Sequence, residues 1–233
     1  MIRLAQFFRR QKLPPELERR LDEWQRLAAP SPADIPRRWV VVDTETSGLS
    51  TGRDKLIAIG AVAGEGRAIV VEPSFEAVLR QETVSSRDNI ELHGVGASAQ
   101  EGGEDPASAL VRFLEFARKD PLAAYHAEFD ATFLRRAIKA SLGICFGGEW
   151  LDLATLVPRK FPVLARELHG LDPWLARFGI EVGERHNALA DAFATAQLFL
   201  IADGRARRDG KNRLADLLAI AGEHASGMAR LGR

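Results

Sequence analysis

Residues 39–50, WVVVDTETSGLS, constrain the fold more than any other stretch of this sequence. An apolar run ends at Asp43, and Glu45 follows after a single threonine. Side chains at positions i and i+2 of a strand point to the same face of a sheet. Two like charges would therefore repel each other at the end of a buried strand. The pattern predicts that a positive group lies between them.

Composition sets the broad class of protein. With 233 residues, 46% of them hydrophobic and 27% charged, the chain is expected to form one main domain with short extensions. Lys+Arg and Asp+Glu both number 32, so no overall positive field indicates a polyanionic partner, and nucleic acid stays open as a partner without support from bulk charge.

The cellular compartment is predicted from the cysteine content and from the lengths of the apolar runs. A single cysteine, Cys145, excludes an intramolecular disulfide framework and a cysteine-based zinc cluster, and it suits a reducing compartment. No apolar run approaches the roughly 20 residues that span a bilayer. The first ten residues are too short and too rich in arginine for a secretory signal. We expect a cytoplasmic protein that does not contact a membrane.

Three regions are expected along the chain. Residues 1–37 combine an amphipathic helix with a Pro-rich linker, residues 38–202 form the main domain, and residues 203–233 form a helical extension. The apolar stripe of the first helix is expected to pack on the main domain, with docking to another protein as the alternative. This stripe consists of Leu17, Leu21, Trp24 and Leu27. The C-terminal extension either closes the domain or binds a partner.

The main domain mixes strands and helices. Three strands joined by short turns begin it and predict an antiparallel meander, and later strands alternate with helices to give a mixed sheet with helices on its faces. Strands are expected at 38–45, 55–64, 66–73, 121–129 and 150–157, and helices at 105–119, 130–143, 172–180 and 187–204.

Two more acidic residues extend the opening pattern. Asp130 follows a predicted short strand, and Asp191 lies in a predicted helix five residues after His186. Each is weak evidence alone, because solvated acids are common on helices. Together with the first pair they place four acids in mainly apolar segments, where an unpaired buried charge would cost several kcal/mol. Carboxylates without cysteine suit hard divalent ions such as Mg²⁺ or Mn²⁺.

Three motifs now carry a family resemblance: VVDTETSGL at 41–49, AYHAEFDATFL at 124–134 and RHNALADAFATAQLF at 185–199. The chain resembles the DEDDh family of 3′→5′ exonucleases, which includes the proofreading (epsilon) subunit of bacterial DNA polymerase III. The similarity also takes in LIAIGAV, LHGV and WLDLATL and covers residues 38–202. It implies a ribonuclease H-like fold, an α/β mixed sheet of antiparallel meander and parallel strands, which agrees with the elements expected above.

The resemblance also implies roles for individual residues. Asp43, Glu45, Asp130 and Asp191 would hold two divalent ions, Mg²⁺ or Mn²⁺, and His186 would be the general base. The pocket for the 3′-terminal nucleotide would be lined by Thr44, Gly48, Leu49, His93 and Phe129.

The chain departs from the family pattern at two positions. His126 stands where many members have asparagine, and Ala58 stands where an acidic or polar residue is frequent. Neither position is a metal ligand, but the first changes how the substrate strand is held. His126 is either a hydrogen-bonded structural residue or a rival base.

The expected reaction is hydrolysis of single-stranded or frayed DNA ends to nucleoside 5′-monophosphates, in proofreading or repair. Two ions about 3.5 to 4 Å apart would activate the water and steady the leaving oxygen, and a histidine with a pKa of about 6.5 would take the proton. An exoribonuclease resembling ribonuclease T or oligoribonuclease is the alternative, because DNA and RNA differ by contacts to the 2′-hydroxyl. An inactive nucleic-acid- or protein-binding module is a third interpretation.

Two further expectations concern partners and local geometry. A polymerase or other protein would bind through the N- or C-terminal helices, and basic residues would either contact the nucleic-acid backbone or form a solvated face. These are Arg135, Arg136, Arg159, Lys160 and Arg166. In one continuous helix His186 and Asp191 would lie roughly 140° apart. We therefore expect His186 on a loop, Asn187 as a possible N-cap, and Asp191 in the second turn.

Overall fold

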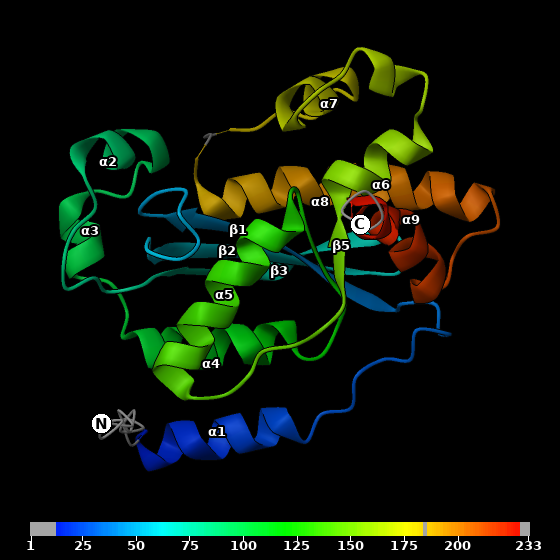
Figure 1. The fold of residues 1–233 in the computed structure, drawn as a ribbon. Coiled ribbons are helices and arrows are strands. Elements are labelled where there is room, and N and C mark those ends of the chain that lie inside the picture. Colours follow the sequence, from blue (N-terminus) through cyan, green and yellow to red (C-terminus); the bar gives the residue numbers. More distant parts are fainter. Residues whose placement is uncertain (1–12, 184–185, 229–233) are drawn as a thin grey trace, which may run out of the picture.

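A computed structural model describes residues 13–183 and 186–228, without the side chains of residues 92, 93 and 223–228. A five-stranded mixed sheet forms its centre, with strand order β3-β2-β1-β4-β5 (Figure 1). Strands β1 to β3 pair antiparallel, while β4 and β5 extend the sheet in parallel with β1. The meander predicted from the sequence is confirmed. The strands are β1 (Arg38–Thr46), β2 (Leu56–Glu65), β3 (Ala68–Val78), β4 (Leu122–Ala124) and β5 (Trp150–Asp152).

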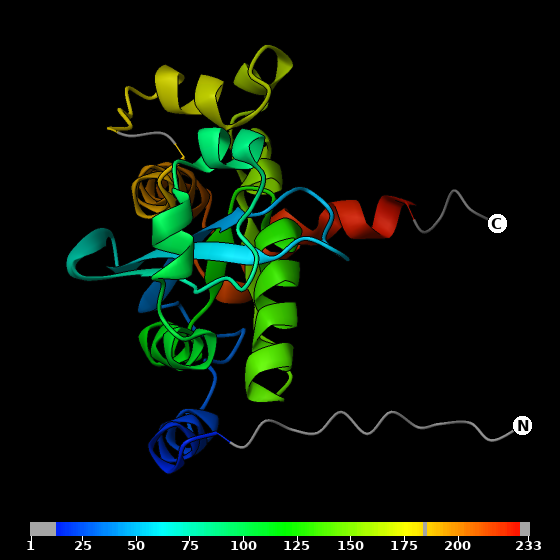
Figure 2. The same ribbon diagram turned by 90° about the vertical axis from the view of Figure 1, so that its left-hand side faces the viewer.

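Helices cover both faces of this sheet. In Figure 2, α5 and α8 lie on opposite sides of the strands. The helices are α1 (Pro15–Gln25), α2 (Arg87–His93), α3 (Ala97–Glu101), α4 (Pro106–Ala117), α5 (Ala127–Leu142), α6 (Leu153–Lys160), α7 (Leu171–Arg177), α8 (Ala188–Arg208) and α9 (Leu214–Met228), with a 3₁₀ turn at Leu164–Arg166.

The alternation of side chains along β1 divides the core in two. Val40 and Val42 join the cluster beneath α4 and α5, whereas Trp39 and Val41 join the cluster beneath α8. This is the two-residue period of a strand buried on both faces. The same alternation continues into the polar end of β1, so it decides which helix each of the following side chains meets.

Helix α1 packs against α4 on the outside of the domain. Leu17, Leu21 and Trp24 are buried in the core cluster beneath α4 and α5, as expected of the stripe. Leu27 was predicted to belong to the stripe, and that prediction is wrong. It lies beyond the end of α1 and is 45% exposed, because the chain turns into the Pro-rich linker, where helix cannot continue.

The linker between α1 and β1 contacts the start of α9. The backbone amides of Leu214 and Ala215 donate to the carbonyl oxygens of Asp34 and Pro32, at 2.9 and 2.8 Å. These bonds supply partners for amides that a helix start leaves without intrahelical acceptors. Both extensions are therefore joined to each other, and the boundary expected at residue 203 falls inside α8.

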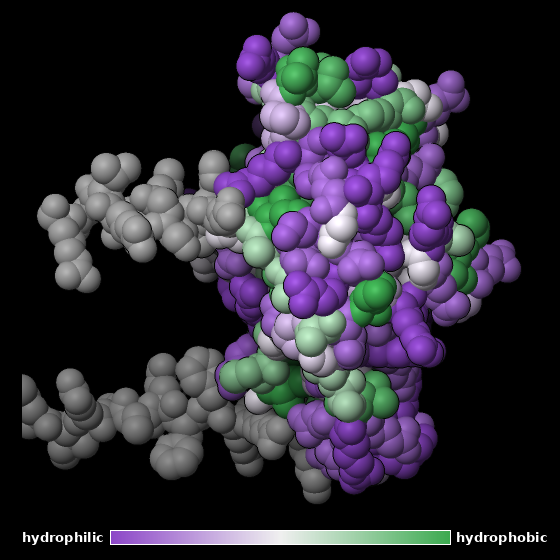
Figure 3. Space-filling view, turned by 90° about the vertical axis from the view of Figure 1, so that its right-hand side faces the viewer, coloured by the Kyte–Doolittle hydropathy of each residue, from purple (hydrophilic) through white to green (hydrophobic). Residues whose placement is uncertain are grey.

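Other element boundaries differ from the sequence prediction. The strand expected at 150–157 ends at Asp152 and is followed by α6 from Leu153, and α5 begins at Ala127 rather than at Asp130. The sequence prediction did not include α2 and α3. In the described part of the chain, no helix is both long enough and apolar enough to cross a membrane. The face shown in Figure 3 is mainly hydrophilic, with its apolar residues in small separate patches.

Candidate metal centre

Three of the four predicted acids lie together at the end of β1. Carboxylate oxygens of Asp43, Glu45 and Asp191 all lie within 4.8 Å of one another. Asp191 is buried, and Asp43 and Glu45 are partly buried. Three like charges at this spacing repel one another strongly unless a cation or protons balance them.

A glycine on the neighbouring strand allows α8 to approach this closely. Asp43 pairs with Gly60 of β2 across the antiparallel ladder, and cross-strand partners share a face. A β-carbon at Gly60 would lie 2.1 Å from the backbone carbon of Ala188, at the start of α8. The absent side chain therefore lets α8 bring Asp191 beside Asp43. We did not identify Gly60 from the sequence, although a glycine inside an apolar strand signals a close backbone approach.

The start of α8 agrees with the predicted geometry at His186 and Asn187 but not at Asp191. His186 precedes the helix in a left-handed conformation, with φ of 62°, and Asn187 is the N-cap, its Oδ1 accepting from the amide of Ala190 at 2.9 Å. The backbone amide of His186 donates to Asp191 Oδ2 at 3.0 Å, and the residue is exposed. Asp191 lies in the first turn rather than the expected second. The preceding Glu184 and Arg185 lie outside the described residues.

Asp130 lies apart from the group of three. Its Oδ1 accepts a hydrogen bond of 2.7 Å from Thr44 Oγ1, and both side chains are buried. Thr44 alternates with Asp43 and Glu45 along β1, so it faces the side of the strand on which α5 packs. Burial raises the pKa of Asp130 to about 7, against which the Thr44 hydrogen bond acts. The ionised form of Asp130 is therefore costly unless a cation compensates it.

This donor set fits divalent cations of the hard class. It offers carboxylate oxygens and no thiolate, which suits Mg²⁺ or Mn²⁺ better than structural zinc. Asp43, Glu45 and Asp191 would hold such an ion directly, and the buried Asp130 on the other side of β1 would gain most from added positive charge.

The other predicted site residues lie in the loop after β1, on α5 and at the end of α2. Leu49 is 83% exposed, and the Gly48 carbonyl accepts from Thr46 Oγ1 at 2.8 Å. Phe129 lies on α5 with its ring 4.9 Å from that of Phe133. His93 is the last residue of α2, and its side chain lies outside the described part of the structure.

Several of the basic residues, for which either backbone contact or a solvated face was expected, form bonds within the protein. Arg136 donates from α5 to the carbonyls of Thr51 and Asp54, which fixes the loop after β1. Arg135 pairs with Glu128 at 3.0 Å, and Lys160 pairs with Asp209 at 2.7 Å. His126, the rival base, is exposed and is the N-cap residue of α5, in a left-handed conformation with φ of 65°. None of these intramolecular partners was evident from the sequence, because each contact depends on the folded chain.

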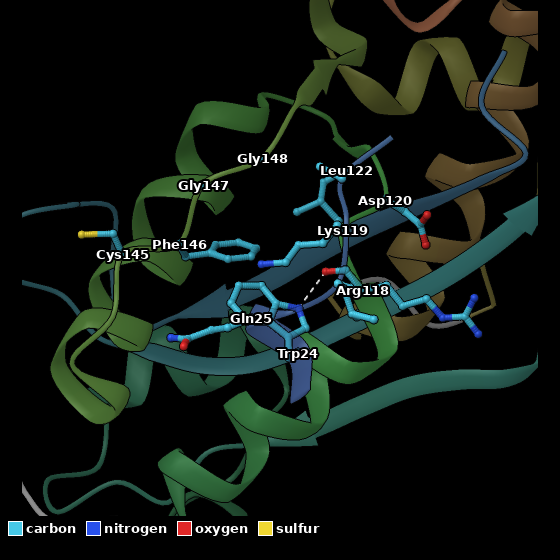
Figure 4. Close-up of a pocket in the computed structure, with 13 residues that line it drawn as sticks. Trp24, Gln25, Arg118, Lys119, Asp120, Leu122, Cys145, Phe146, Gly147 and Gly148 are labelled. Carbon is cyan, nitrogen blue, oxygen red and sulfur yellow. Dashed lines mark hydrogen bonds between the residues drawn. The ribbon is translucent and has the colours of Figure 1, made fainter. Parts of the chain in front are cut away.

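A cavity of about 440 Å³ lies away from the acids. It is lined by residues at the end of α1, the end of α4, the start of β4 and the segment 145–148 before β5. Figure 4 shows the Lys119 side chain reaching over Trp24 towards Phe146, while Arg118 points away. The cavity thus lies where β4 and β5 begin, whereas the acids lie where the parallel β1 ends. None of the predicted site residues lines it.

Comparison with known proteins places the chain in a family. Nucleases and phosphatases are among the enzymes that use pairs of bound divalent ions, and a cluster of carboxylates is suited to hold such ions. The family model of the RNase T type, described as "Exonuclease", matches residues 40–199. The chain belongs to this exonuclease family, the DEDD exonucleases.

The relatives include parts of bacterial replicative polymerases. The chain is 30% identical over 179 residues to the DNA polymerase III PolC-type of Thermotoga maritima, covering 77% of this chain and 13% of that protein. It is 34% identical over 165 residues to a DNA polymerase III subunit epsilon-like protein of Rhodobacter capsulatus, covering 70% and 23%. The chain therefore spans less than a quarter of the length of either relative.

Solved structures confirm the fold. Escherichia coli Exonuclease I in complex with a dT13 oligonucleotide superposes with a TM-score of 0.60 at 18% identity, covering 73% of this chain and 42% of that chain. Exonuclease X in complex with 5′ overhanging duplex DNA gives a TM-score of 0.60 at 18% identity, covering 79% and 99%. The fold is the ribonuclease H-like exonuclease fold that the sequence predicted.

Proposed function

We propose that this chain is a 3′→5′ exonuclease that hydrolyses single-stranded or frayed DNA ends to nucleoside 5′-monophosphates. The observation that carries the proposal is the carboxylate cluster of Asp43, Glu45 and Asp191, with His186 on an exposed turn beside it, in a chain of the exonuclease family. The cluster provides negative charge for cations, and the exposed histidine provides a group that can accept a proton near neutral pH.

Each group has a distinct part in the proposed reaction. Two divalent ions, when bound, would supply water activation and charge stabilisation. Asp43, Glu45 and Asp191 would hold them from the α8 side of β1, and Asp130 is proposed to join them from the α5 side, across the end of the strand. His186 would take the proton of the attacking water at its imidazole. Its backbone amide bond to Asp191 ties the turn to the cluster, while the exposed side chain stays accessible to solvent and substrate.

The substrate end would lie against the loop after β1. Leu49 offers an exposed apolar side chain to a terminal base, and Arg136 holds the same loop through the carbonyls of Thr51 and Asp54. Thr44 is proposed to act indirectly, by holding Asp130, because its hydroxyl donates a hydrogen bond to that carboxylate. Gly48, Phe129 and His93 remain proposed contacts of the terminal nucleotide.

DNA is the proposed substrate because the similar proteins point to it. The solved structures of Exonuclease I and Exonuclease X are complexes with DNA, and the relatives in sequence are DNA polymerase III proteins. An exoribonuclease is the second candidate, since the described site residues do not separate the two sugars. Through the exposed sides of its terminal helices, the chain could serve a polymerase, which would make its role proofreading.

A digestion series tests the proposal. Single-stranded DNA, RNA of the same sequence and a duplex with a mispaired 3′ end, each labelled at the 5′ end, are incubated with Mg²⁺ or Mn²⁺. We expect a ladder that shortens from the 3′ end, fastest for single-stranded and mispaired DNA, and none after chelation. Faster digestion of RNA would select the exoribonuclease, and activity that survives chelation or begins at 5′ ends would refute the proposal.

A further inference from the structure

The carboxylate of Asp152, at the end of β5, receives four hydrogen bonds from the described part of the chain. Its Oδ1 accepts from the backbone amides of His126, Ala127 and Ala154, at 3.0, 3.2 and 3.1 Å, and its Oδ2 accepts from Thr155 Oγ1 at 2.9 Å. One side chain therefore caps α6, which follows it directly, and also the start of α5, which lies 25 residues earlier.

The second of these caps is needed because α5 lacks one of its own. His126 is the N-cap residue of α5, and its side chain forms no capping hydrogen bond. The first amides of a helix have no intrahelical acceptors and lie at the positive end of the helix dipole, so a carboxylate stabilises them. Asp152 supplies that carboxylate from a neighbouring strand.

Asp130 lies in the first turn of α5, so the cap determines its position. The start of α5 is held from β5 by Asp152, and the carboxylate of Asp130 is held from β1 by the Thr44 hydroxyl. If the two bonds to Asp152 are lost, the first turn of α5 is free to shift relative to β1. The Asp130 carboxylate would then move relative to Asp43 and Glu45, which are part of β1 itself.

We propose that Asp152 is a positioning residue of the candidate metal centre, holding the first turn of α5 so that Asp130 stays aligned with the acids of β1. This inference rests on the proposed function. It assigns to Asp152 a role that is separate from metal binding, since its oxygens are occupied by amides and a hydroxyl.

Three substitutions separate this role from a purely structural one. Asp152→Ser keeps a good cap for α6 but is one bond shorter, so it should release α5. Asp152→Asn keeps the accepting oxygen and should preserve both caps. Asp105→Ala is the matched control, because Asp105 caps α4 through Ser108, at 3.0 Å, and α4 carries none of the candidate metal ligands.

Two readouts are taken for each full-length variant. The first is the Mn²⁺ concentration that gives half of the metal-induced rise in melting temperature, and the second is kcat and KM on single-stranded DNA at saturating metal. We expect Asp152→Ser to raise the half-saturating concentration or lower kcat by about 10- to 100-fold, the usual effect of losing a group that orients a metal ligand. Asp152→Asn should stay close to wild type. Asp105→Ala should melt at a lower temperature without a change in metal response.

Several outcomes would overturn the proposal. A folded Asp152→Ser protein with wild-type metal response and kcat would show that the contact is only structural. If Asp152→Asn is as impaired as Asp152→Ser, the charge matters rather than the caps. A wild-type protein that neither responds to Mn²⁺ nor degrades nucleic acid would refute the proposed function itself, whereas a responsive wild type with unaffected Asp152→Ser refutes the positioning role alone.

Discussion

The two ends of the central sheet handle charge in opposite ways. Where β1 ends, Asp43, Glu45 and Asp191 crowd their oxygens within 4.8 Å. Where β4 begins, the Lys119 ammonium lies 3.0 Å from the centre of the Trp24 ring, and no ion pair of Lys119 is present among the described residues.

The difference lies in how the neighbouring side chains act on each charge. An aromatic face attracts a cation, so Trp24 stabilises Lys119 without help from outside. Burial lowers the pKa of Lys119, which is the expected effect of removing water from a cation. Like carboxylates offer one another no such stabilisation. A bound cation would therefore stabilise the acidic end, and the α1 end contributes to the stability of the domain.

Asp43→Ala is the substitution with the largest expected effect on the acidic end. We expect it to abolish release of nucleotides from single-stranded DNA, because the remaining acids cannot hold both ions in the required geometry. The metal-induced rise in melting temperature should shrink as well. Nucleotide release and melting with and without Mn²⁺ are the measurements, and Lys119→Met at the other end is the control that should remain active. Wild-type turnover of Asp43→Ala would refute the metal assignment.

His186→Ala should reduce catalysis while leaving the acidic cluster in place. We expect kcat to fall by about 10²- to 10⁴-fold, the usual contribution of a general base, and the acidic limb of the pH profile to vanish. The metal-induced rise in melting temperature should persist, because the bond from His186 to Asp191 comes from the backbone amide, which the substitution keeps.

His126→Ala is the matched control for that prediction. His126 is exposed, and its helix is capped by Asp152 rather than by its own side chain. A variant of His126 that folds but is inactive, together with a His186→Ala protein that keeps its kcat and needs more metal, would reverse the assignment of the base.

Trp24→Ala should affect the other end of the sheet. The indole is 4% exposed, donates from Nε1 to the Arg118 carbonyl at 2.8 Å and carries Lys119 on its ring. Its removal should lower the free energy of unfolding by about 3–5 kcal/mol, measured by denaturant titration. Under conditions where both proteins are folded, kcat should be unchanged. A proportional loss of kcat would show that the two ends are coupled.

A pH series on metal-free protein tests the burial of Asp130. Burial raises its pKa from 3.8 to about 7, so the folded protein keeps a proton that the unfolded chain releases in this range. The contribution of this group to stability is complete below pH 3.8 and is lost as the pH rises to about 7.

Asp130→Asn should remove that decline of the unfolding free energy, which is a few kcal/mol at most. At pH 8, added Mn²⁺ should raise the unfolding free energy of the wild type more than that of the variant. Identical pH profiles for the two metal-free proteins would show that Asp130 is not the group responsible.

Much of the fold follows from local patterns in the sequence. The meander, the shared face of Asp43 and Glu45, and the loop position of His186 rest on strand and helix periods that act over a few residues. The family motifs added the fold type. Boundaries were less predictable: α5 begins at Ala127 instead of Asp130, because the cap that allows this start comes from Asp152, far away in sequence.

The sequence by itself determined which residues could form a metal centre, since the type of side chain and the strand period are local properties. Only the tertiary structure decided how they meet. Gly60 lets α8 bring Asp191 onto the face of Asp43, while Thr44 holds Asp130 on the opposite face of the same strand. These positions depend on close packing between elements that are distant in the chain, and close packing is settled only when the whole core is assembled.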